Sequence, residues 1–191
     1  MSFGGTLAFE LAKRFERMGK RVVFAGALDT PPNIAFLGSS GFLRFLLLDL
    51  LGVRSVLSPS DIHDLKSNLR MKPQEHFIEL LFEKHGARLL EAGLTPARIE
   101  AWQNVLDGVI EMSLKYEAEG ATETLDVFWA GPVVQWGFTE EEWSSSIHKW
   151  DGCVKSLKYH RVKGDHLTLT SSEHIDDFQV VLNNALRCRG I

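Results

Sequence analysis

The chain has 191 residues, 45% of them hydrophobic, and a formal net charge of -4. This length and apolar content suffice for one buried core with an attached subdomain. The lysine and arginine residues are scattered along the chain, which argues against a nucleic-acid-binding protein and predicts no nucleic-acid partner.

The cysteines and the most apolar run bear on location. Cys153 and Cys188 form no C-x-x-C motif and no secretory signal precedes them, so we expect reduced thiols and a cytoplasmic protein. The run from Phe42 to Leu51 is interrupted by Arg44 and Asp49 and is shorter than the ~20 residues of a membrane span. We therefore expect no membrane partner.

The first element is an amphipathic helix followed by a buried strand. From Thr6 to Met18, apolar residues recur at helical spacing, with charged residues on the other side: Leu7, Leu11 and Phe15, with Ala8 and Ala12 beside them. The unbroken apolar run from residue 22 to 28 is typical of a parallel strand that is covered on both faces. Asp29 stands at its carboxyl end. A helix followed by such a strand is typical of α/β proteins.

Residues 34–118 then show helical patterns separated by glycine and proline, without a convincing strand. Four helices are expected, at Gly41–Leu51, Ser58–Leu69, Pro73–His85 and Thr95–Tyr116. The last begins with an N-cap threonine and a proline at the first helical position. An all-helical block between two strands predicts a subdomain inserted over the sheet edge, acting as a lid.

Strand patterns return after residue 118 and alternate with helices. A strand is expected at Leu125–Ala130, and a capping box of Thr139 with Glu142 predicts a helix running toward Trp150. The remaining expected elements are a strand at Val154–Val162, a loop at Gly164–His166 and a closing helix at Ser172–Arg187 with an apolar stripe.

The first five residues, Met1-Ser2-Phe3-Gly4-Gly5, match the second half of a Gly-x-Ser-x-Gly nucleophile elbow. In this motif a serine lies on a strained turn between a strand and a helix. Ser2 and Gly4 fit, whereas the first glycine and the preceding strand do not occur. We therefore expect a chain that begins inside its own active site, either as a fragment or as a truncated gene model.

Three residues occupy the positions that a serine hydrolase requires. Such an enzyme uses a hydroxyl nucleophile, an imidazole base and a carboxylate that orients the imidazole. Ser2 precedes the first helix, Asp29 ends the first strand and His166 follows the last strand. This order of serine, acid and histidine is that of α/β-hydrolases. Ser2, Asp29 and His166 are the predicted catalytic residues.

Each of the three also has an ordinary explanation. A terminal Ser-x-Gly-Gly sequence can be flexible chain, Asp29 can shape the turn before two prolines, and His166 can be a packed or exposed loop residue. The three placements together favour the catalytic interpretation, because each is independently at the correct end of its element.

Competing residues fit these roles less well. Asp165 adjoins His166, but sequence neighbours usually point apart, so we expect it to shape the loop. The loop 131–139 contains no Asp or Glu, which leaves Asp29 as the acid. We expect His174 to be a solvent-exposed helix residue. The other histidines lack metal-ligand spacing, so no metal site is predicted.

These segments resemble the type I thioesterase domains of nonribosomal peptide and polyketide synthetases. The resemblance rests on residues 2–12, which match S-x-G-G-x-x-A-x-E-x-A, on the acid loop 28–32 and on the G-x-H segment 164–166. The resemblance extends over the whole chain, and the sequence of residues 3–10 is similar to that of fungal synthetases, including those that make quinones. It implies an α/β-hydrolase-like, mostly parallel sheet over residues 1–191, lacking the N-terminal strands, with a helical lid at 34–118.

The resemblance implies a thioesterase that takes an acyl, peptidyl or polyketide-type group from the phosphopantetheine of a carrier domain onto Ser2. Hydrolysis or cyclisation then releases the product, and the domain itself binds no cofactor. The Phe3 backbone N–H is the expected oxyanion donor. The second donor is not encoded here; its loss costs about 3 kcal/mol, which predicts weak or no activity for this chain. The alternatives are a non-catalytic docking module for a carrier domain and a free-standing esterase or lipase. The acyl group and the oligomeric state are left open.

Overall fold

The computed structural model describes residues 3–33, 77–133 and 138–191. The chain divides into two compact units, one made of Met1–Ile34 with Tyr116–Ile191 and the other of Ala35–Lys115. The second unit lies within the segment 34–118 that the sequence marks as helical. Its role as a lid stays a prediction.

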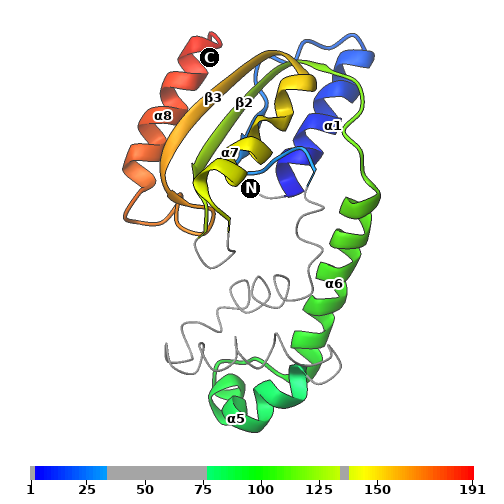
Figure 1. The fold of residues 1–191 in the computed structure, drawn as a ribbon, viewed down its shortest axis with the longest axis vertical. Helices are drawn as coiled ribbons and strands as arrows, with labels where there is room; N and C mark the ends of the chain where they lie inside the picture. Colours follow the sequence, from blue (N-terminus) through cyan, green and yellow to red (C-terminus); the bar gives the residue numbers. More distant parts are fainter. Residues whose placement is uncertain (1–2, 34–76, 134–137) are drawn as a thin grey trace. The chain divides into compact units, whose positions relative to one another are not determined.

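The first unit is built on a parallel three-stranded sheet (Figure 1). The strands β1 (Gly26–Leu28), β2 (Thr122–Gly131) and β3 (Val154–Asp165) lie side by side in that order. Ala27 pairs with Val127, and Thr122 pairs with Val154. Because all three strands run the same way, their carboxyl ends meet at one edge of the sheet.

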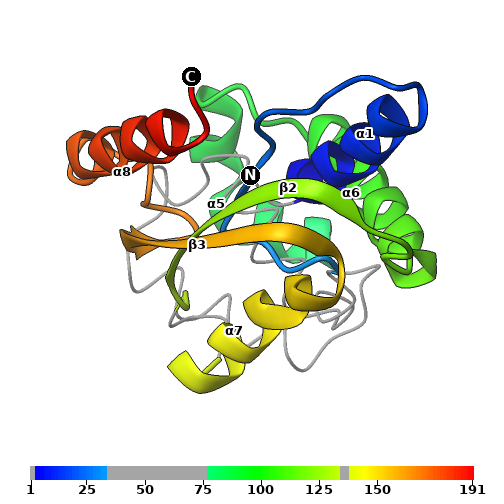
Figure 2. The ribbon, with the colours of Figure 1, turned by 90° about the horizontal axis from the view of Figure 1, so that it is seen from above.

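Helices cover both faces of this sheet. Helix α8 (Ile175–Cys188) and helix α7 (Glu140–Ile147) lie on opposite sides of β2 and β3 (Figures 1 and 2). The α8 side holds a core of Phe128, Ala130, Val162, Leu169, Phe178 and Ala185, against which Leu28 packs. Successive residues of a strand point to opposite faces, so Ala27 of β1 points away from the α8 side, to which Leu28 points. Gly5 of helix α1 (Phe3–Arg17) lies against Ala27, which places α1 on the α7 side of the sheet.

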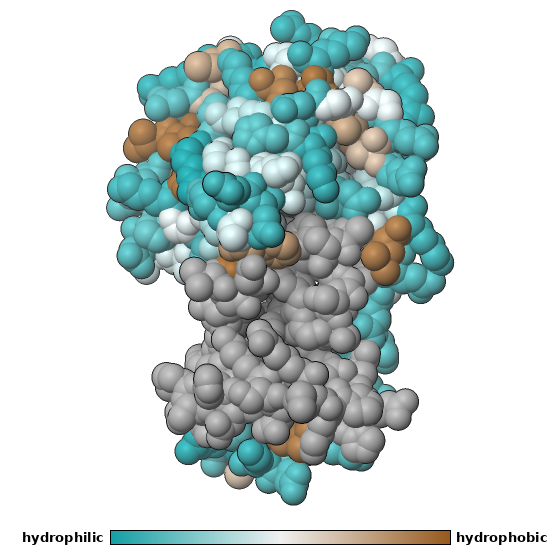
Figure 3. All heavy atoms as spheres, viewed as in Figure 1, coloured by the Kyte–Doolittle hydropathy of each residue, from teal (hydrophilic) through white to brown (hydrophobic). Residues whose placement is uncertain are grey.

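The expected apolar face of α1 is wrong. Its large residues Leu7, Leu11 and Phe15 are exposed at 52%, 45% and 49%. Ala12 of the expected face is buried, together with Phe9 from outside it. The buried face is the one with small residues, which allow the helix to approach the sheet closely. Phe9 there meets the Trp150 ring edge-on at a centroid distance of 5.2 Å. The exposed stripe adds apolar side chains to a surface that is otherwise largely hydrophilic, as Figure 3 shows for one face of the described part.

The strand bounds differ from the expected ones. β1 is only Gly26–Leu28, although the apolar run begins four residues earlier, and β3 continues to Asp165. β2 is buried without interruption from Thr124 to Phe128. Cover on both faces is expected for the run 22–28 and is wrong there, because only Ala25 and Ala27 of that run are buried and Val23 is 43% exposed. The closing helix is confirmed, with Phe178 and Ala185 of its stripe buried.

The second unit contains α5 (Phe77–Glu91) and α6 (Pro96–Lys115) within its described part. The hydroxyl of Thr95 accepts the backbone N–H of Arg98 at 3.2 Å, which confirms the predicted N-cap. The helices expected at Gly41–Leu51 and Ser58–Leu69 lie outside the described residues. Among the described helices, none is long and apolar enough to cross a membrane.

A buried ion cluster joins the end of α8 to the sheet. Asp126 in β2 is fully buried, and its two carboxylate oxygens lie 2.7 Å from His160 Nε2 and 2.7 Å from Arg189 Nε. Arg189 also donates to the hydroxyl and carbonyl oxygens of Ser156. The cluster therefore ties the C-terminal residues to both β2 and β3.

Replacing Asp126 with Asn should lower the free energy of unfolding by about 3–5 kcal/mol, because the largely buried Arg189 guanidinium loses its counter-charge. Glu123→Gln is the matched control, since Glu123 and its partner Lys155 are 61% and 66% exposed. That substitution should cost less than about 1 kcal/mol. Urea denaturation measures both, and equal costs would contradict a structural role for the cluster.

Candidate active site

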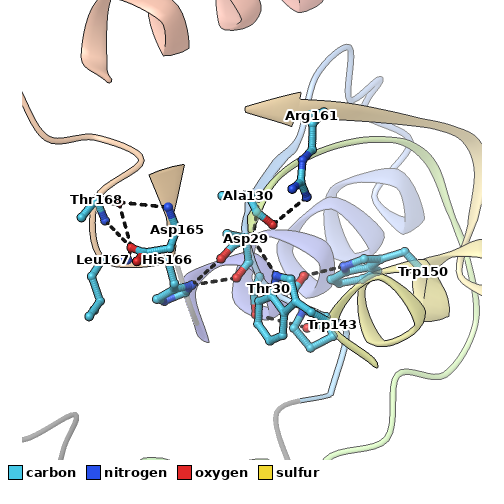
Figure 4. A network of polar contacts seen from close by, with 11 residues as sticks. Asp29, Thr30, Ala130, Trp143, Trp150, Arg161, Asp165, His166, Leu167 and Thr168 are labelled. Atoms are coloured by element: carbon cyan, nitrogen blue, oxygen red, sulfur yellow. Dashed lines mark hydrogen bonds and ion pairs between the residues drawn. The ribbon is translucent and has the colours of Figure 1, made fainter. Parts of the chain in front are cut away.

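Asp29 follows β1 directly and is fully buried. Its φ is 47°, the one positive value found among the described non-glycine residues. Asp tolerates this left-handed conformation better than most residues, although it still costs energy. The turn places the side chain of Asp29 beside the carboxyl end of β2, where its Oδ1 accepts the Ala130 N–H at 2.8 Å (Figure 4).

A second donor reaches the same oxygen from α7. The indole N–H of Trp143 donates to Asp29 Oδ1 at 3.2 Å, and Trp143 is 1% exposed. Helix α7 is held by the predicted capping box, in which the Thr139 hydroxyl accepts the Glu142 N–H and Glu142 accepts the Thr139 N–H. The hydrogen bonds from the backbone and the hydroxyl of Thr139 lower the pKa of Glu142. The first residues of α7 are therefore fixed next to Asp29.

His166 follows the end of β3 and is also buried. Its Nδ1 lies 2.8 Å from the backbone oxygen of Asp29 and 3.1 Å from Asp29 Oδ2. Both oxygens are acceptors, so Nδ1 carries the proton in this arrangement. Nε2 is then the basic nitrogen of the neutral ring. The sequence-predicted pair of Asp29 and His166 is thus brought into hydrogen-bonding contact.

The loop that carries His166 is shaped by its own polar groups. Gly164 has a φ of 82°, which favours glycine. The carboxylate of Asp165 accepts the N–H groups of Leu167 and Thr168 and the hydroxyl of Thr168, at 2.8–3.0 Å. This confirms the expectation that Asp165 shapes the loop instead of orienting the imidazole.

The chain after Asp29 is anchored by neighbouring elements. The Trp150 indole N–H donates to the Thr30 carbonyl at 2.8 Å, and the Thr6 hydroxyl donates to the Pro32 carbonyl at 3.3 Å. On the other side, Arg161 donates to the Ala130 carbonyl at 2.9 Å. The contacts of Trp150 and Arg161 are drawn in Figure 4.

The predicted nucleophile Ser2 lies outside the described residues. The helix that follows it begins at Phe3. Its third residue, Gly5, lies against Ala27 and Thr30, which flank Leu28 and Asp29 in the sequence. The first N–H groups of a helix have no acceptor within that helix, which suits the Phe3 N–H to the predicted oxyanion role. The complete triad and this donor remain predictions.

Other histidines have other surroundings. His174 is wrongly expected to be solvent-exposed: it occupies the N-cap position of α8 with a side chain only 18% exposed, and its ring packs over Gly164. His148 contacts the Ser144 carbonyl, and His160 contacts Asp126. In the described ranges, no group of three or more His, Cys, Asp or Glu side chains is arranged to hold a metal ion.

Sequence reasoning missed the residues that hold Asp29 in place. Ala130 acts through its backbone, which no side-chain pattern reveals. Trp143 and Trp150 are hydrophobic by composition, and their indole N–H groups gain a role only once α7 lies on the sheet. The capping box at Thr139 was the one available signal, because it places Trp143 in the first turn of α7.

Comparisons with other sequences relate the chain to fungal synthetases. No protein-family model matches it. The whole chain aligns at 36% identity with an inactive atromentin synthetase of Paxillus involutus, at 31% with atromentin synthetase of Suillus grevillei and at 30% with that of Tapinella panuoides. The chain spans 20% of the length of each. The predicted resemblance to fungal synthetases is confirmed.

Comparisons with solved structures concern the fold. The Vlm2 thioesterase domain bound with a dodecadepsipeptide has a TM-score of 0.62 at 17% identity, over 95% of this chain and 62% of that one. A four-domain nonribosomal peptide synthetase, holo-AB3403 bound to AMP and glycine, gives 0.65 at 16% identity, over 96% and 14%. The α/β-hydrolase-like fold with a parallel sheet is thereby confirmed.

The close approach of α1 to Asp29 can be tested at two adjacent glycines. A Cβ on Gly5 would overlap the Thr30 methyl and lie 3.1 Å from Ala27 Cβ, so Gly5→Ala should destabilise the fold by about 1–3 kcal/mol. A Cβ on Gly4 meets nothing within 4 Å, so Gly4→Ala should be neutral or stabilise by up to about 1 kcal/mol. Thermal unfolding measures the stability of both variants. A shift in Tm of the same sign and size in the two would contradict the close packing of Gly5.

Proposed function

From the premise that this chain is related to fungal atromentin synthetases and has the fold of nonribosomal peptide synthetase thioesterase domains, we propose that it is a serine thioesterase. It would release an acyl group from the phosphopantetheine arm of a carrier domain through an acyl ester on Ser2. The observation that supports this most is the contact of His166 Nδ1 with two oxygens of Asp29, which leaves Nε2 as the base.

The reaction begins at the serine hydroxyl. Ser2 Oγ attacks the thioester carbonyl carbon while His166 Nε2 takes the hydroxyl proton. The Asp29 carboxylate stabilises the imidazolium that results, and the Phe3 N–H binds the oxygen that becomes negative. The carbon–sulfur bond then breaks, and the departing pantetheine sulfur takes the proton from His166. The product of this half-reaction is an acyl ester on Ser2.

The second half-reaction releases the product. Water, or a nucleophile within the acyl group, attacks the ester carbonyl and gives its proton to His166 Nε2. The ester bond to Ser2 Oγ breaks, and Oγ takes that proton back. Attack by water gives a free acid, and attack by an internal nucleophile gives a cyclic product. The helical segment 34–118 would enclose the acyl group as a lid, and the domain would need no cofactor of its own.

A second candidate is a non-catalytic module that docks a carrier domain. The observation that favours it is that three relatives, at 33–36% identity, are named inactive atromentin synthetases. Such a module would keep the fold and the carrier-binding surface without turnover. The two candidates differ in whether Ser2 reacts.

Covalent labelling with a fluorophosphonate separates the candidates. We expect the 191-residue chain to form one adduct on the Ser2 peptide and Ser2→Ala to form none. Asp29→Asn should slow the labelling by about 10³–10⁴-fold, because the amide no longer holds the imidazole in the required tautomer. Asn also accepts the left-handed conformation of Asp29, so the fold should be kept.

Intact-mass and peptide mass spectrometry measure the adduct. Ser171→Ala is the matched control, since the buried Ser171 hydroxyl has no hydrogen-bond partner within the described ranges and its loss should leave the labelling unchanged. Absence of an adduct on folded chain, together with retained binding of a carrier domain, would support the docking module and sink the enzyme.

A further inference from the structure

We propose that Trp143 is a positioning residue whose indole N–H holds the Asp29 carboxylate in the orientation that presents Oδ2 to His166. This inference rests on the proposed function, since it assigns Trp143 a part in orienting the base. It concerns a residue that reaches the site from α7, an element that carries none of the predicted catalytic residues.

The two carboxylate oxygens of Asp29 have separate partners. Oδ1 accepts from the Ala130 backbone and from Trp143 Nε1, at 2.8 and 3.2 Å, while Oδ2 lies 3.1 Å from His166 Nδ1. The terminal torsion of an Asp side chain has a broad energy minimum, so the torsional preference of the side chain alone fixes the carboxylate orientation poorly. Two donors on Oδ1, from two different elements, fix it instead.

The donor from α7 is itself rigid. Trp143 is 1% exposed, and its ring centroid lies 5.9 Å from that of Phe138. Its backbone N–H donates to the Thr139 carbonyl at 3.0 Å. The capping box of Thr139 with Glu142 fixes the start of the helix. An indole N–H is a donor only, so it suits a carboxylate and gives a single orientation of the pair.

The surroundings of Asp29 make this donor consequential. Asp29 is fully buried, and a buried carboxylate needs hydrogen-bond donors in place of the water it has lost. Hydrogen bonds to a charged acceptor are about twice as strong as neutral ones. Of the two donors to Oδ1 described above, only the Ala130 N–H would remain without the indole N–H. The carboxylate could then rotate about that single hydrogen bond.

Trp150 provides a matched comparison. It is also fully buried, and its indole N–H donates at 2.8 Å to the carbonyl of Thr30, the residue next to Asp29. Its acceptor is a backbone carbonyl and not the carboxylate. Loss of the N–H at position 150 therefore tests packing and loop anchoring, whereas loss at position 143 also tests the orientation of Asp29.

The experiment replaces each indole with 3-benzothienylalanine, which has sulfur in place of the N–H and keeps the ring shape. Trp143→Phe is the second variant at this position. Turnover of an acyl-pantetheine thioester gives kcat and KM, and the one-dimensional proton spectrum shows the His166 Nδ1–H resonance. Replacement at 143 should lower kcat by about 10–100-fold without raising KM and should broaden or shift that resonance. Replacement at 150 removes an anchor of the neighbouring peptide but not a donor to the carboxylate, so it should change both kcat and the resonance less than replacement at 143.

The outcomes separate the inference from the proposed function. The fluorophosphonate adduct on Ser2 tests the proposed function, and the resonance decides the role of Trp143 whether or not the wild-type chain turns over a thioester. A resonance that changes more at 143 than at 150 supports positioning. A resonance that stays the same in both variants at 143, or changes equally at 143 and 150, overturns it.

Discussion

The buried carboxylate of Asp29 is the group on which the site depends. It lies at a strained backbone turn, out of water, and meets donors from three elements: the end of β2, helix α7 and the loop after β3. A buried charge is tolerated only when its partners are in place. Sheet, α7 and the His166 loop must therefore be assembled before Asp29 can be accommodated, and the same assembly orients the imidazole.

The parallel sheet explains how these partners meet. Asp29, Ala130 and His166 each follow or end a strand, and parallel strands bring their carboxyl ends to one edge. The helices add what the strands lack. α1 brings its glycine-containing first turn against the chain flanking Asp29, and α7 brings an indole donor. The ion cluster of Asp126 and Arg189 lies elsewhere on the sheet and serves the attachment of α8.

Much of this arrangement could be predicted from the sequence, for identifiable reasons. Asp29 and His166 were recognisable because each follows a strand pattern, and the caps at Thr95 and Thr139 because side-chain capping is local chemistry. The buried face of α1 was not recognisable: Leu7, Leu11 and Phe15 are more apolar than Gly5 and Thr6, and spacing alone does not tell which face a sheet will meet. Trp143 was missed because its partner is distant in sequence and depends on tertiary packing.

The central claim is that Asp29 acts on catalysis only through His166. A double-mutant cycle tests it most directly, by comparing fluorophosphonate labelling rates of Asp29→Asn, His166→Ala and the variant with both. The account predicts strong non-additivity, with Asp29→Asn costing almost nothing once the imidazole is gone. An undiminished effect of Asp29→Asn in the His166→Ala background would contradict it.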